Sequence, residues 1–381
     1  MDTQAVTRHP VLDHASLGQI SLVLQGGGAL GAYQAGVYQA LDEAGIEPDW
    51  VIGASIGAIN AAIIAGNRPG QRLPRLREFW ARMTHAPLTQ LFAQAPVFGQ
   101  TAAAAMTMFG GLPAFFRPNP WAFVGIGLTP ESAGYYDTAP LEATLKDLVD
   151  PEVLGTCKPR LTVGAASVRT AEMRYFDSRD TPLTIRHVMA SGALPPAFPA
   201  VRIDGELYWD GGILSNTPVE CVFDDMPRRD GLVFTVNIWQ PDGPEPADMA
   251  AVMSRQKDLQ YASRARAQVV RQKQLHRLRH IVAELAARLP EDARNDPVLR
   301  AMAAYGCLTR MHVVRLLAPA LRGEGHTKDI DFSPDGIRRR WEAGHRDTLR
   351  VLDQQPWTHP FDPLEGFILH ETEHGTIVVE G

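Results

Sequence analysis

The chain has 381 residues, of which 45% are hydrophobic and 21% are charged. This balance is typical of a soluble globular protein with one large core or two moderate ones. The formal net charge of −6 argues against general affinity for nucleic acid, so we expect no nucleic-acid partner.

No segment predicts secretion or a membrane span. Residues 1–17 form a mostly polar predicted tail that lacks the basic start and apolar run of a secretory signal. In the most hydrophobic region, 101–128, glycine, proline and arginine interrupt every run before it reaches the roughly 20 apolar residues that span a bilayer. Cys157, Cys221 and Cys307 are far apart and odd in number, which predicts free thiols in a reducing compartment. We therefore expect a cytoplasmic protein.

The first predicted strand runs directly into a glycine-rich turn. Residues 20–24 are mostly apolar, as in a strand covered on both faces. The glycines of the turn are followed by a helical pattern that ends near Gly45, and a second strand begins at Trp50. Strand, helix and strand in this order predict a βαβ unit and hence a parallel sheet. The glycines are Gly26, Gly27, Gly28 and Gly31.

Two interpretations fit this turn. The spacing Gly26-x-Gly28-x-x-Gly31 matches the beginning of a dinucleotide-binding fingerprint. That fingerprint needs an acid at the far end of the second strand, whereas Asp49 precedes the strand. We favour the other interpretation, in which backbone amides exposed by the missing side chains of Gly27 and Gly28 form an oxyanion hole.

The second strand leads into a G-x-S-x-G sequence. Residues 53–57 read Gly-Ala-Ser-Ile-Gly and precede an apolar helical pattern over 58–65. In a nucleophile elbow this pattern lifts the serine oxygen clear of the sheet, at a helix N-terminus that favours developing negative charge. Gly53 and Gly57 leave room for the tight turn. An ordinary strand–helix turn with a capping serine also fits these five residues, so the prediction of Ser55 as nucleophile depends on the motifs that follow.

Residues 84–135 show no clean period and are rich in large apolar side chains. They follow an amphipathic helix predicted over 72–83. A structureless stretch this long inside a domain is usually functional or partly helical. Two interpretations stay open: an inserted subdomain that packs its own aromatic residues, or a flap or acyl-chain groove that contacts lipid. The aromatic residues are Phe92, Phe98, Phe109, Phe115, Phe116, Trp121 and Phe123.

A predicted hairpin precedes the second candidate catalytic residue. Residues 161–167 and 173–176 predict paired strands, and 185–190 predict a short helix. A hairpin over 201–209 then leads to Asp210-Gly211-Gly212. An acid at the end of a strand, followed by two glycines, fits a carboxylate that points into a cavity. An ordinary turn with Asp in its usual position fits the tripeptide as well.

The character of the sequence changes beyond a proline-rich linker over 240–246. A long helix is predicted over 249–289, a strand over 312–317 and a final amphipathic helix over 333–352. The long helix is strongly basic, which is typical of a solvated face and also fits contact with anionic lipid headgroups. His276 and His280 are four residues apart without an evident third ligand, so we predict no metal site. The basic residues are Arg255, Lys257, Arg264, Arg266, Arg271, Lys273, Arg277, Arg279 and Arg288.

Three motifs in this order resemble those of the patatin-like phospholipase family: residues 26–31, 53–57 and 210–212. The proline-rich segment after Ser191 resembles a further block of that family. The resemblance covers residues 18–240 as a catalytic domain and implies a three-layer α/β/α fold with a mostly parallel central sheet. Residues 241–381 resemble the mainly helical C-terminal extension of some bacterial members. At one position the chain departs from the family, because Leu30 stands where many members carry Arg or Lys.

The resemblance also implies a mechanism. Ser55 would be the nucleophile and Asp210 its general base, in hydrolysis of a phospholipid or lysophospholipid acyl ester through an acyl-enzyme, without metal or cofactor. Because a free aspartate has a pKa of about 4, this role needs burial to raise the pKa of Asp210. The oxyanion hole is assigned to Gly26, Gly27 and Gly28, and the supporting turn residues are Gly31, Gly53, Gly57, Gly211 and Gly212.

Several alternatives stay open. Histidines that follow Asp210 in the chain allow a Ser–Asp–His triad, but none lies in a loop after a strand of the motif-bearing domain, so we favour the dyad. A thioesterase or acyltransferase would use the same site, and a catalytically silent lipid-binding scaffold would not use it. The expected partners are a lipid substrate and an anionic membrane surface, and the sequence does not indicate an oligomeric state. The histidines are His276, His280, His312, His326 and His345.

Overall fold

A computed structural model describes most of the chain. The predicted N-terminal tail falls almost wholly outside the described residues, as do much of the predicted insertion over 84–135 and Cys157. The described residues are 17–84, 105, 107–124, 128–156, 158–321, 324–362, 365–373 and 376–380.

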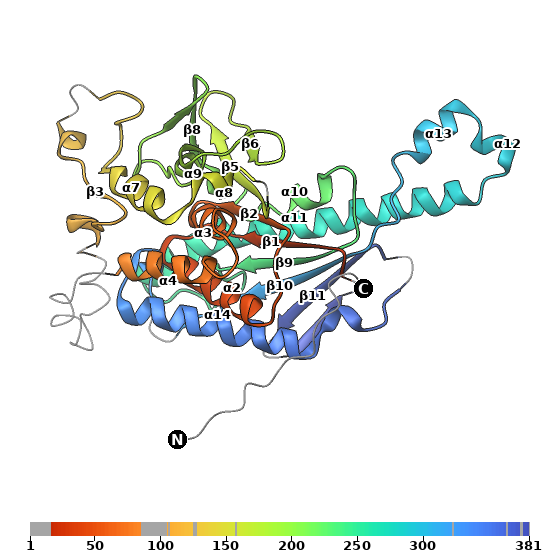
Figure 1. The fold of residues 1–381 in the computed structure, drawn as a ribbon. Coiled ribbons are helices and arrows are strands. Elements are labelled where there is room, and N and C mark those ends of the chain that lie inside the picture. The colour runs from red at the N-terminus through yellow and green to blue at the C-terminus, as the bar shows by residue number, and fades with distance from the viewer. Residues whose placement is uncertain are drawn as a thin grey trace.

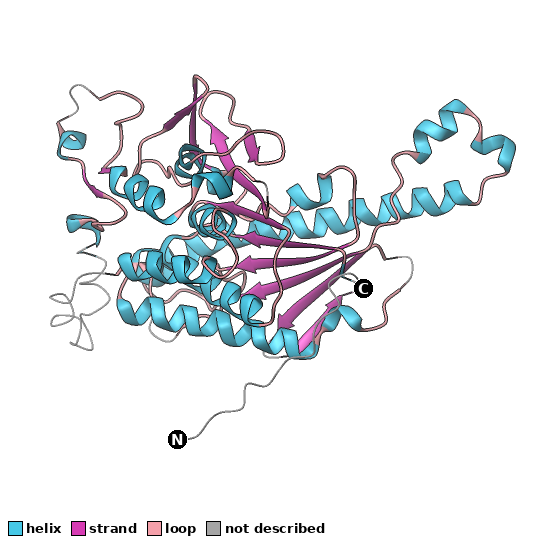
Figure 2. Cartoon of the chain, viewed as in Figure 1, coloured by secondary structure: helices cyan, strands magenta, loops and turns pink. Residues whose placement is uncertain are grey.

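One mixed sheet forms the centre of the molecule (Figures 1 and 2). Its strand order is β12-β11-β10-β9-β1-β2-β5-β8-β7, and β6 pairs with β5. The strands from β11 to β5 in this order are parallel to their neighbours, whereas β12, β6, β8 and β7 pair antiparallel. The strands are β1 (Gln19–Leu24), β2 (Trp50–Ala54), β5 (Arg160–Ser167), β6 (Met173–Asp177), β7 (Val201–Ile203), β8 (Glu206–Asp210), β9 (Gly231–Asn237), β10 (Met311–Leu317), β11 (Phe367–Glu373) and β12 (Thr376–Glu380).

Alternate side chains of the strands point to opposite faces of the sheet. Helices pack on each face around a hydrophobic core, so the fold has three layers. On one face Leu22 and Phe234 pack with α2, α3, α4 and α14, and on the other Val23 and Val233 pack with α10 and α11. This alternation follows from the period of two along a strand. The predicted α/β/α architecture with a mostly parallel sheet is confirmed. The helices are α2 (Ala32–Glu43), α3 (Ile56–Ala65), α4 (Arg72–Arg82), α7 (Ala139–Leu148), α9 (Ile185–Ser191), α10 (Glu220–Asp224), α11 (Met249–Ala287) and α14 (Pro334–Gln354), with the 3-10 turns η1 (Gly28–Gly31) and η5 (Lys328–Ile330).

The C-terminal region shares this sheet. Strands β10 and β11 extend it beyond β9, and α14 packs along α2 so closely that a Cβ on Gly36 would lie 1.9 Å from the carbonyl oxygen of Trp341. The region is largely helical, as predicted. Its strands nevertheless continue the sheet across the boundary predicted at residue 240, so that boundary does not separate two sheets.

The distal half of α11 projects from the body of the molecule (Figure 1). It extends past the amino ends of the parallel strands together with α12 (Glu291–Arg294) and α13 (Pro297–Ala303), whereas the predicted motifs follow the carboxyl ends. Within the described ranges, none of the helices has both the length and the apolar character needed to cross a membrane.

Candidate active site

Ser55 lies on a strained turn between β2 and α3. Its φ of 55° and ψ of −127° fall in a region that side chains rarely adopt, at a cost of about 1–3 kcal/mol. Gly53 and Gly57 permit this turn, because a Cβ on Gly53 would lie 2.3 Å from the carbonyl oxygen of Gly57. A Cβ on Gly57 would lie 2.2 Å from the carbonyl oxygen of Leu24. The predicted elbow geometry is therefore present.

The register of the sheet brings Asp210 to Ser55. Strand β2 pairs with β5 up to Ala54 opposite Gly164, and β8 takes over with Asp210 opposite Ala165. Because β6 occupies the other edge of β5 over these residues, β2 and β8 meet end to end on one edge. The residue after Ala54 is Ser55, so the hydroxyl and the carboxyl lie together.

Asp210 is buried, with 1% of its surface exposed. Burial raises the pKa of its carboxyl to about 7, while hydrogen bonds from Ser55 and from the Gly212 amide act in the opposite direction. The amide of Gly212 donates to Oδ1 of Asp210 over 2.7 Å. A carboxylate with this pKa is a stronger base than a free aspartate at neutral pH.

Ser191 fixes the elbow from the other side. The amide of Ser55 donates to the carbonyl oxygen and to Oγ of Ser191, both over 3.1 Å. The hydroxyl of Ser191 donates in turn to the carbonyl oxygen of Gly164 over 2.6 Å. We did not predict this contact, since it joins the end of α9 to the elbow across a long stretch of chain. The only sequence signal was a serine beside the proline-rich segment.

One assigned oxyanion donor is wrong. The amide of Gly26 donates to the carbonyl oxygen of Asn216 over 3.1 Å, so it does not face the serine. The carbonyl oxygen of Gly26 accepts from Asn216 Nδ2 over 3.0 Å and from Trp239 Nε1 over 2.7 Å. Gly26 therefore anchors the turn, and the assignment passes to Gly27 and Gly28. Their amides have no protein acceptor in the part of the chain that the structure describes.

The remaining motif glycines allow close packing. A Cβ on Gly31 would lie 2.7 Å from Cγ1 of Ile56, and a Cβ on Gly211 would lie 2.3 Å from the carbonyl oxygen of Gly164. A Cβ on Gly212 would lie 2.7 Å from Oδ1 of Asn216, the same residue that holds Gly26. Asn216 thus links the first and third motifs, a role that its sequence position did not indicate.

We expect Gly28→Ala to impair the site more than the fold. Gly28 has a φ of +56°, and a Cβ there would lie 2.2 Å from the carbonyl oxygen of Asp329, so the turn must shift. A shift of about 1 Å in a catalytic group costs about 100-fold in rate. Ester hydrolysis by the purified variant measures kcat. Gly45→Ala is the matched control, because Gly45 also has positive φ but has nothing within 4 Å of its Cβ. Equal kcat for both variants would contradict a catalytic role of this turn.

A cavity opens over the two side chains. It encloses about 960 Å³ of empty space, including that at its mouth, and Ser55, Asp210 and residues 26–28 line it. Most of the other lining side chains are apolar, as in sites for apolar ligands. They include Ile59, Met108, Phe115, Phe116, Phe198 and Phe332.

The predicted aromatic segment contributes to this cavity in part. Phe115 and Phe116 line it, with ring centroids 5.6 Å apart. Phe109 and Trp121 are 82% and 63% exposed and do not line it. Phe92, Phe98 and the side chain of Phe123 lie outside the described residues. Two of the seven aromatic residues, Phe115 and Phe116, therefore line the cavity, and their role in holding an acyl chain stays a prediction.

No histidine in the described part of the chain lines the cavity. His276 Nε2 lies 2.8 Å from the carbonyl oxygen of Thr309, and His312 Nδ1 lies 3.0 Å from Nε2 of His370. Asp49, the acid of the dinucleotide interpretation, accepts from the amide of Ile20 at the amino ends of β1 and β2, whereas the motif turns follow the carboxyl ends. These positions favour the dyad over the triad.

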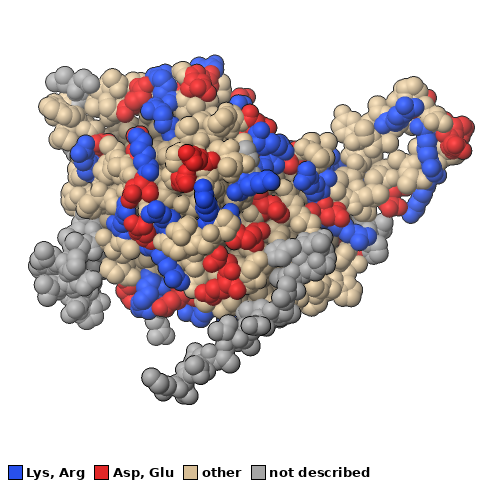
Figure 3. All heavy atoms as spheres, in the orientation of Figure 1, with Lys and Arg blue, Asp and Glu red and all other residues tan. Residues whose placement is uncertain are grey.

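Much of the basic run on α11 is engaged within the protein. Arg255 donates to the carbonyl oxygens of Gln240 and Pro241. On the face in Figure 3, basic and acidic side chains are intermixed. Contact with an anionic membrane stays a prediction. The ion pairs of the helix include Lys257–Asp329, Arg277–Glu365, Arg279–Asp224 and Arg288–Glu284.

A mostly parallel sheet, a serine on a glycine-flanked turn and a buried aspartate in the same cavity define an α/β protein with a nucleophile elbow. The family model described as patatin-like phospholipase matches residues 22–222, and a second, described as patatin phospholipase, matches residues 259–364. Because the first match covers more than half of the chain, the chain belongs to the patatin-like phospholipase family.

Relatives match about half of the chain. The chain is 28% identical over 202 residues to a patatin-like phospholipase domain-containing protein of Caenorhabditis elegans, covering 53% of this chain and 12% of that protein. It is 30% identical over 205 residues to patatin-like phospholipase domain-containing protein 7 of Rattus norvegicus, with the same coverage of 53% and 12%. The chain thus spans about an eighth of the length of these relatives. Among solved structures, VipD from Legionella pneumophila aligns with a TM-score of 0.36 and 17% identity, covering 88% of this chain and 67% of that one.

Proposed function

We propose that the protein is a serine acyl hydrolase that cleaves fatty-acyl esters of phospholipids or lysophospholipids through Ser55 and Asp210. The observation that carries the proposal is the placement of Ser55 and Asp210 in the lining of one cavity, with Asp210 buried and burial raising the pKa of its carboxyl to about 7. A relative from Aspergillus terreus, 48% identical over 67 residues that cover 17% of this chain and 4% of that protein, is named a lysophospholipase. That name supports the substrate class.

The first half-reaction acylates the serine. The Ser55 hydroxyl transfers its proton to Asp210 as its oxygen attacks the ester carbonyl carbon. The resulting oxyanion is stabilised by the Gly27 and Gly28 amides and by the N-terminus of α3, and each such donor contributes about 3 kcal/mol. The intermediate then collapses, the carbon–oxygen bond to the alcohol breaks, and Asp210 returns its proton to the departing alcohol.

The second half-reaction releases the fatty acid. Asp210 takes a proton from water, whose oxygen attacks the acyl carbonyl, and the proton passes to Ser55 as the acyl–serine bond breaks. The apolar lining of the cavity suits the acyl chain, because burial of a methylene group contributes about 0.8 kcal/mol. Phe115, Phe116, Phe198 and Phe332 are among the aromatic residues that line the cavity.

Product analysis tests the proposal. The purified protein is incubated with defined phospholipids, lysophospholipids and an acyl thioester, with and without an added alcohol acceptor, and released products are identified by mass spectrometry. We expect free fatty acid from the glycerolipids. Preferential cleavage of the thioester, or transfer of the acyl group to the alcohol, would assign a thioesterase or an acyltransferase to the same site. If no substrate gives a product and Ser55 does not react with a fluorophosphonate, the alternative of a catalytically silent lipid-binding scaffold is favoured.

A further inference from the structure

Residues 324–332, which we name the wall segment, lie far from the motifs in sequence and beside them in space. Asp329, Ile330 and Phe332 line the cavity over Ser55 and Asp210. Phe332 is buried, with its ring centroid 6.3 Å from that of Phe115, which also lines the cavity. The C-terminal region therefore supplies one side of the proposed substrate cavity.

The wall segment also contacts the oxyanion turn directly. A Cβ on Gly28 would lie 2.2 Å from the carbonyl oxygen of Asp329, so the two backbones meet without room for a side chain. Gly28 carries one of the two amides that we assign to the oxyanion. Because a hydrogen-bond donor must be held to within a fraction of an ångström, a backbone pressed against this turn limits its movement.

Two ion pairs tie the wall segment to α11. Lys257 donates to both carboxylate oxygens of Asp329 over 2.7 and 2.9 Å, and to the carbonyl oxygen of His326 over 3.0 Å. Lys328 donates to both oxygens of Asp258 over 2.7 and 2.9 Å. The second pair is buried, whereas the side chains of Lys257 and Asp329 are 29% and 22% exposed.

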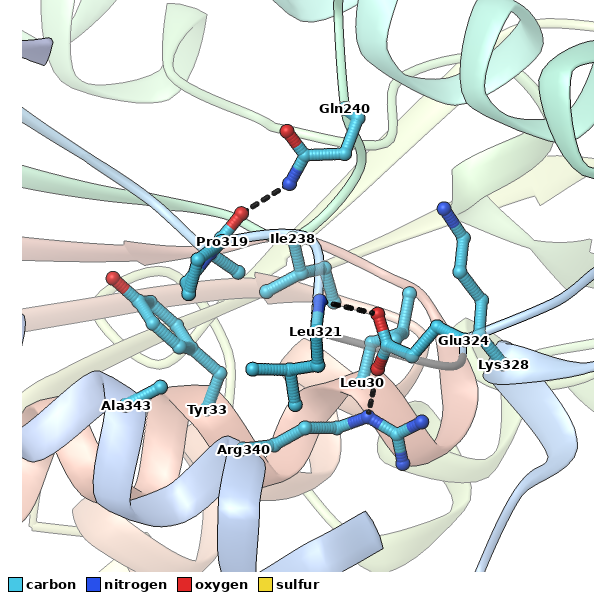
Figure 4. Close-up of a pocket in the computed structure, with 11 residues that line it drawn as sticks. Leu30, Tyr33, Ile238, Gln240, Pro319, Leu321, Glu324, Lys328, Arg340 and Ala343 are labelled. Atoms are coloured by element: carbon cyan, nitrogen blue, oxygen red, sulfur yellow. Dashed lines mark hydrogen bonds and ion pairs between the residues drawn. The ribbon is translucent and has the colours of Figure 1, made fainter. Parts of the chain in front are cut away.

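Helix α14 also holds the wall segment, through Arg340 (Figure 4). Arg340 donates to Glu324 over 3.0 Å and to the carbonyl oxygen of Asp331 over 2.9 Å, so it holds both ends of the wall segment. Arg340, Glu324 and Lys328 border a small pocket that Leu30 also lines. The side chain at the position that departs from the family pattern thus packs toward the C-terminal region.

We propose that the wall segment is a working part of the active site. The Lys257–Asp329 pair positions the Gly28 amide through the backbone of Asp329, and Ile330 limits the length of acyl chain that the cavity accepts. This inference rests on the proposed hydrolase function. It assigns to residues beyond 240 two effects that are measured separately, one on kcat and one on chain-length preference.

Lys257→Met tests the positioning role. Since the pair is partly exposed, its loss leaves no fully buried charge, and we expect little change in the melting temperature. We expect kcat for a soluble short-chain ester to fall about tenfold or more, with KM nearly unchanged, because the donor is misplaced while the cavity stays open. Lys257→Arg keeps the cation and is expected to restore most of kcat. Arg288→Met is the matched control, because it removes an exposed ion pair to Glu284 at the distal end of the same helix, just beyond its last residue.

Ile330→Trp tests the limit on chain length. The larger ring is expected to reduce kcat/KM for long acyl chains at least tenfold relative to short ones. Leu259→Trp, at an exposed position of α11 outside the cavity lining, controls for the added ring and is expected to keep the wild-type chain-length profile.

The outcomes separate this inference from the function on which it rests. If wild type hydrolyses esters and labels at Ser55 while Lys257→Met and Ile330→Trp both match it, the wall segment has no part in catalysis and the inference is overturned. A fall in kcat that Lys257→Arg does not restore also overturns the positioning role. If wild type neither hydrolyses nor labels, the proposed function itself has failed.

Discussion

Replacing Ser55 with alanine is expected to lower kcat/KM for fatty-acyl ester hydrolysis about 10⁴-fold or more while leaving the fold intact. The hydroxyl is the group that forms the covalent intermediate, so the residual rate would come from binding and the oxyanion hole alone. Loss of the hydroxyl removes one interaction of Asp210 but leaves the backbone turn in place, so we expect the fold to be retained.

The measurement compares hydrolysis of a defined lysophospholipid by wild type and variant, with circular dichroism to check the fold. Ser254→Ala, on α11 and outside the cavity lining, serves as the matched control and should keep wild-type kcat/KM. Full activity of Ser55→Ala would show that the reaction takes place at another residue.

Asp210→Asn is expected to lower activity about 10³-fold and to raise stability above neutral pH. Asparagine keeps the shape and still accepts from the Gly212 amide, but it does not take a proton from Ser55. In the wild type, kcat/KM should rise with pH through about 7, since the carboxylate form of Asp210 is the base.

The stability effect has a defined sign. The pKa of Asp210 in the folded protein, about 7, lies above the ordinary value of 3.8, so the folded state holds this proton more tightly than the unfolded chain. Its contribution is fully present below the ordinary value and is lost as the pH rises through about 7. The buried charge then costs on the order of 4 kcal/mol, which Asp210→Asn removes.

Melting temperatures of wild type and Asp210→Asn therefore separate with pH. We expect the variant to melt several degrees higher at pH 8, with a smaller difference at pH 5 and none near pH 4. If the variant is less stable than wild type at pH 8, the ionised carboxylate of Asp210 does not destabilise the folded protein, which contradicts this prediction. Unchanged hydrolysis by Asp210→Asn would exclude it as the base.

The sequence predicts the parts of this site that depend on local geometry. Gly53 and Gly57 flank a turn that only small residues allow, and the hairpin before Asp210 turns at Asp204 and Gly205, which have φ of 48° and 86°. Such requirements act within a few residues, so they leave a readable pattern. The sequence predicts the paired strands over 161–176 and the helix over 185–190 for the same reason, and the structure contains them as β5, β6 and α9.

Contacts between distant segments left no such pattern. The amide of Gly26 is bonded to Asn216, and the turn at Gly28 meets Asp329, and neither pairing follows from spacing or composition. Strands β11 and β12 were not predicted. Charged residues alternate with apolar ones only briefly in β11, whose place in the sheet is set by pairing with β10. The basic residues of α11 suggested a membrane surface, whereas several of them hold other parts of the chain.

The pH dependence of Ser55 acylation by a fluorophosphonate tests the central claim most directly. The modified peptide is identified by mass spectrometry, and the rate of its formation is measured from pH 5 to pH 9 in wild type and Asp210→Asn. We expect labelling at Ser55, with a rate that rises through about pH 7 to a plateau in wild type and stays low and flat in the variant. Labelling at another serine, or the same rate in both proteins at every pH, would contradict the account.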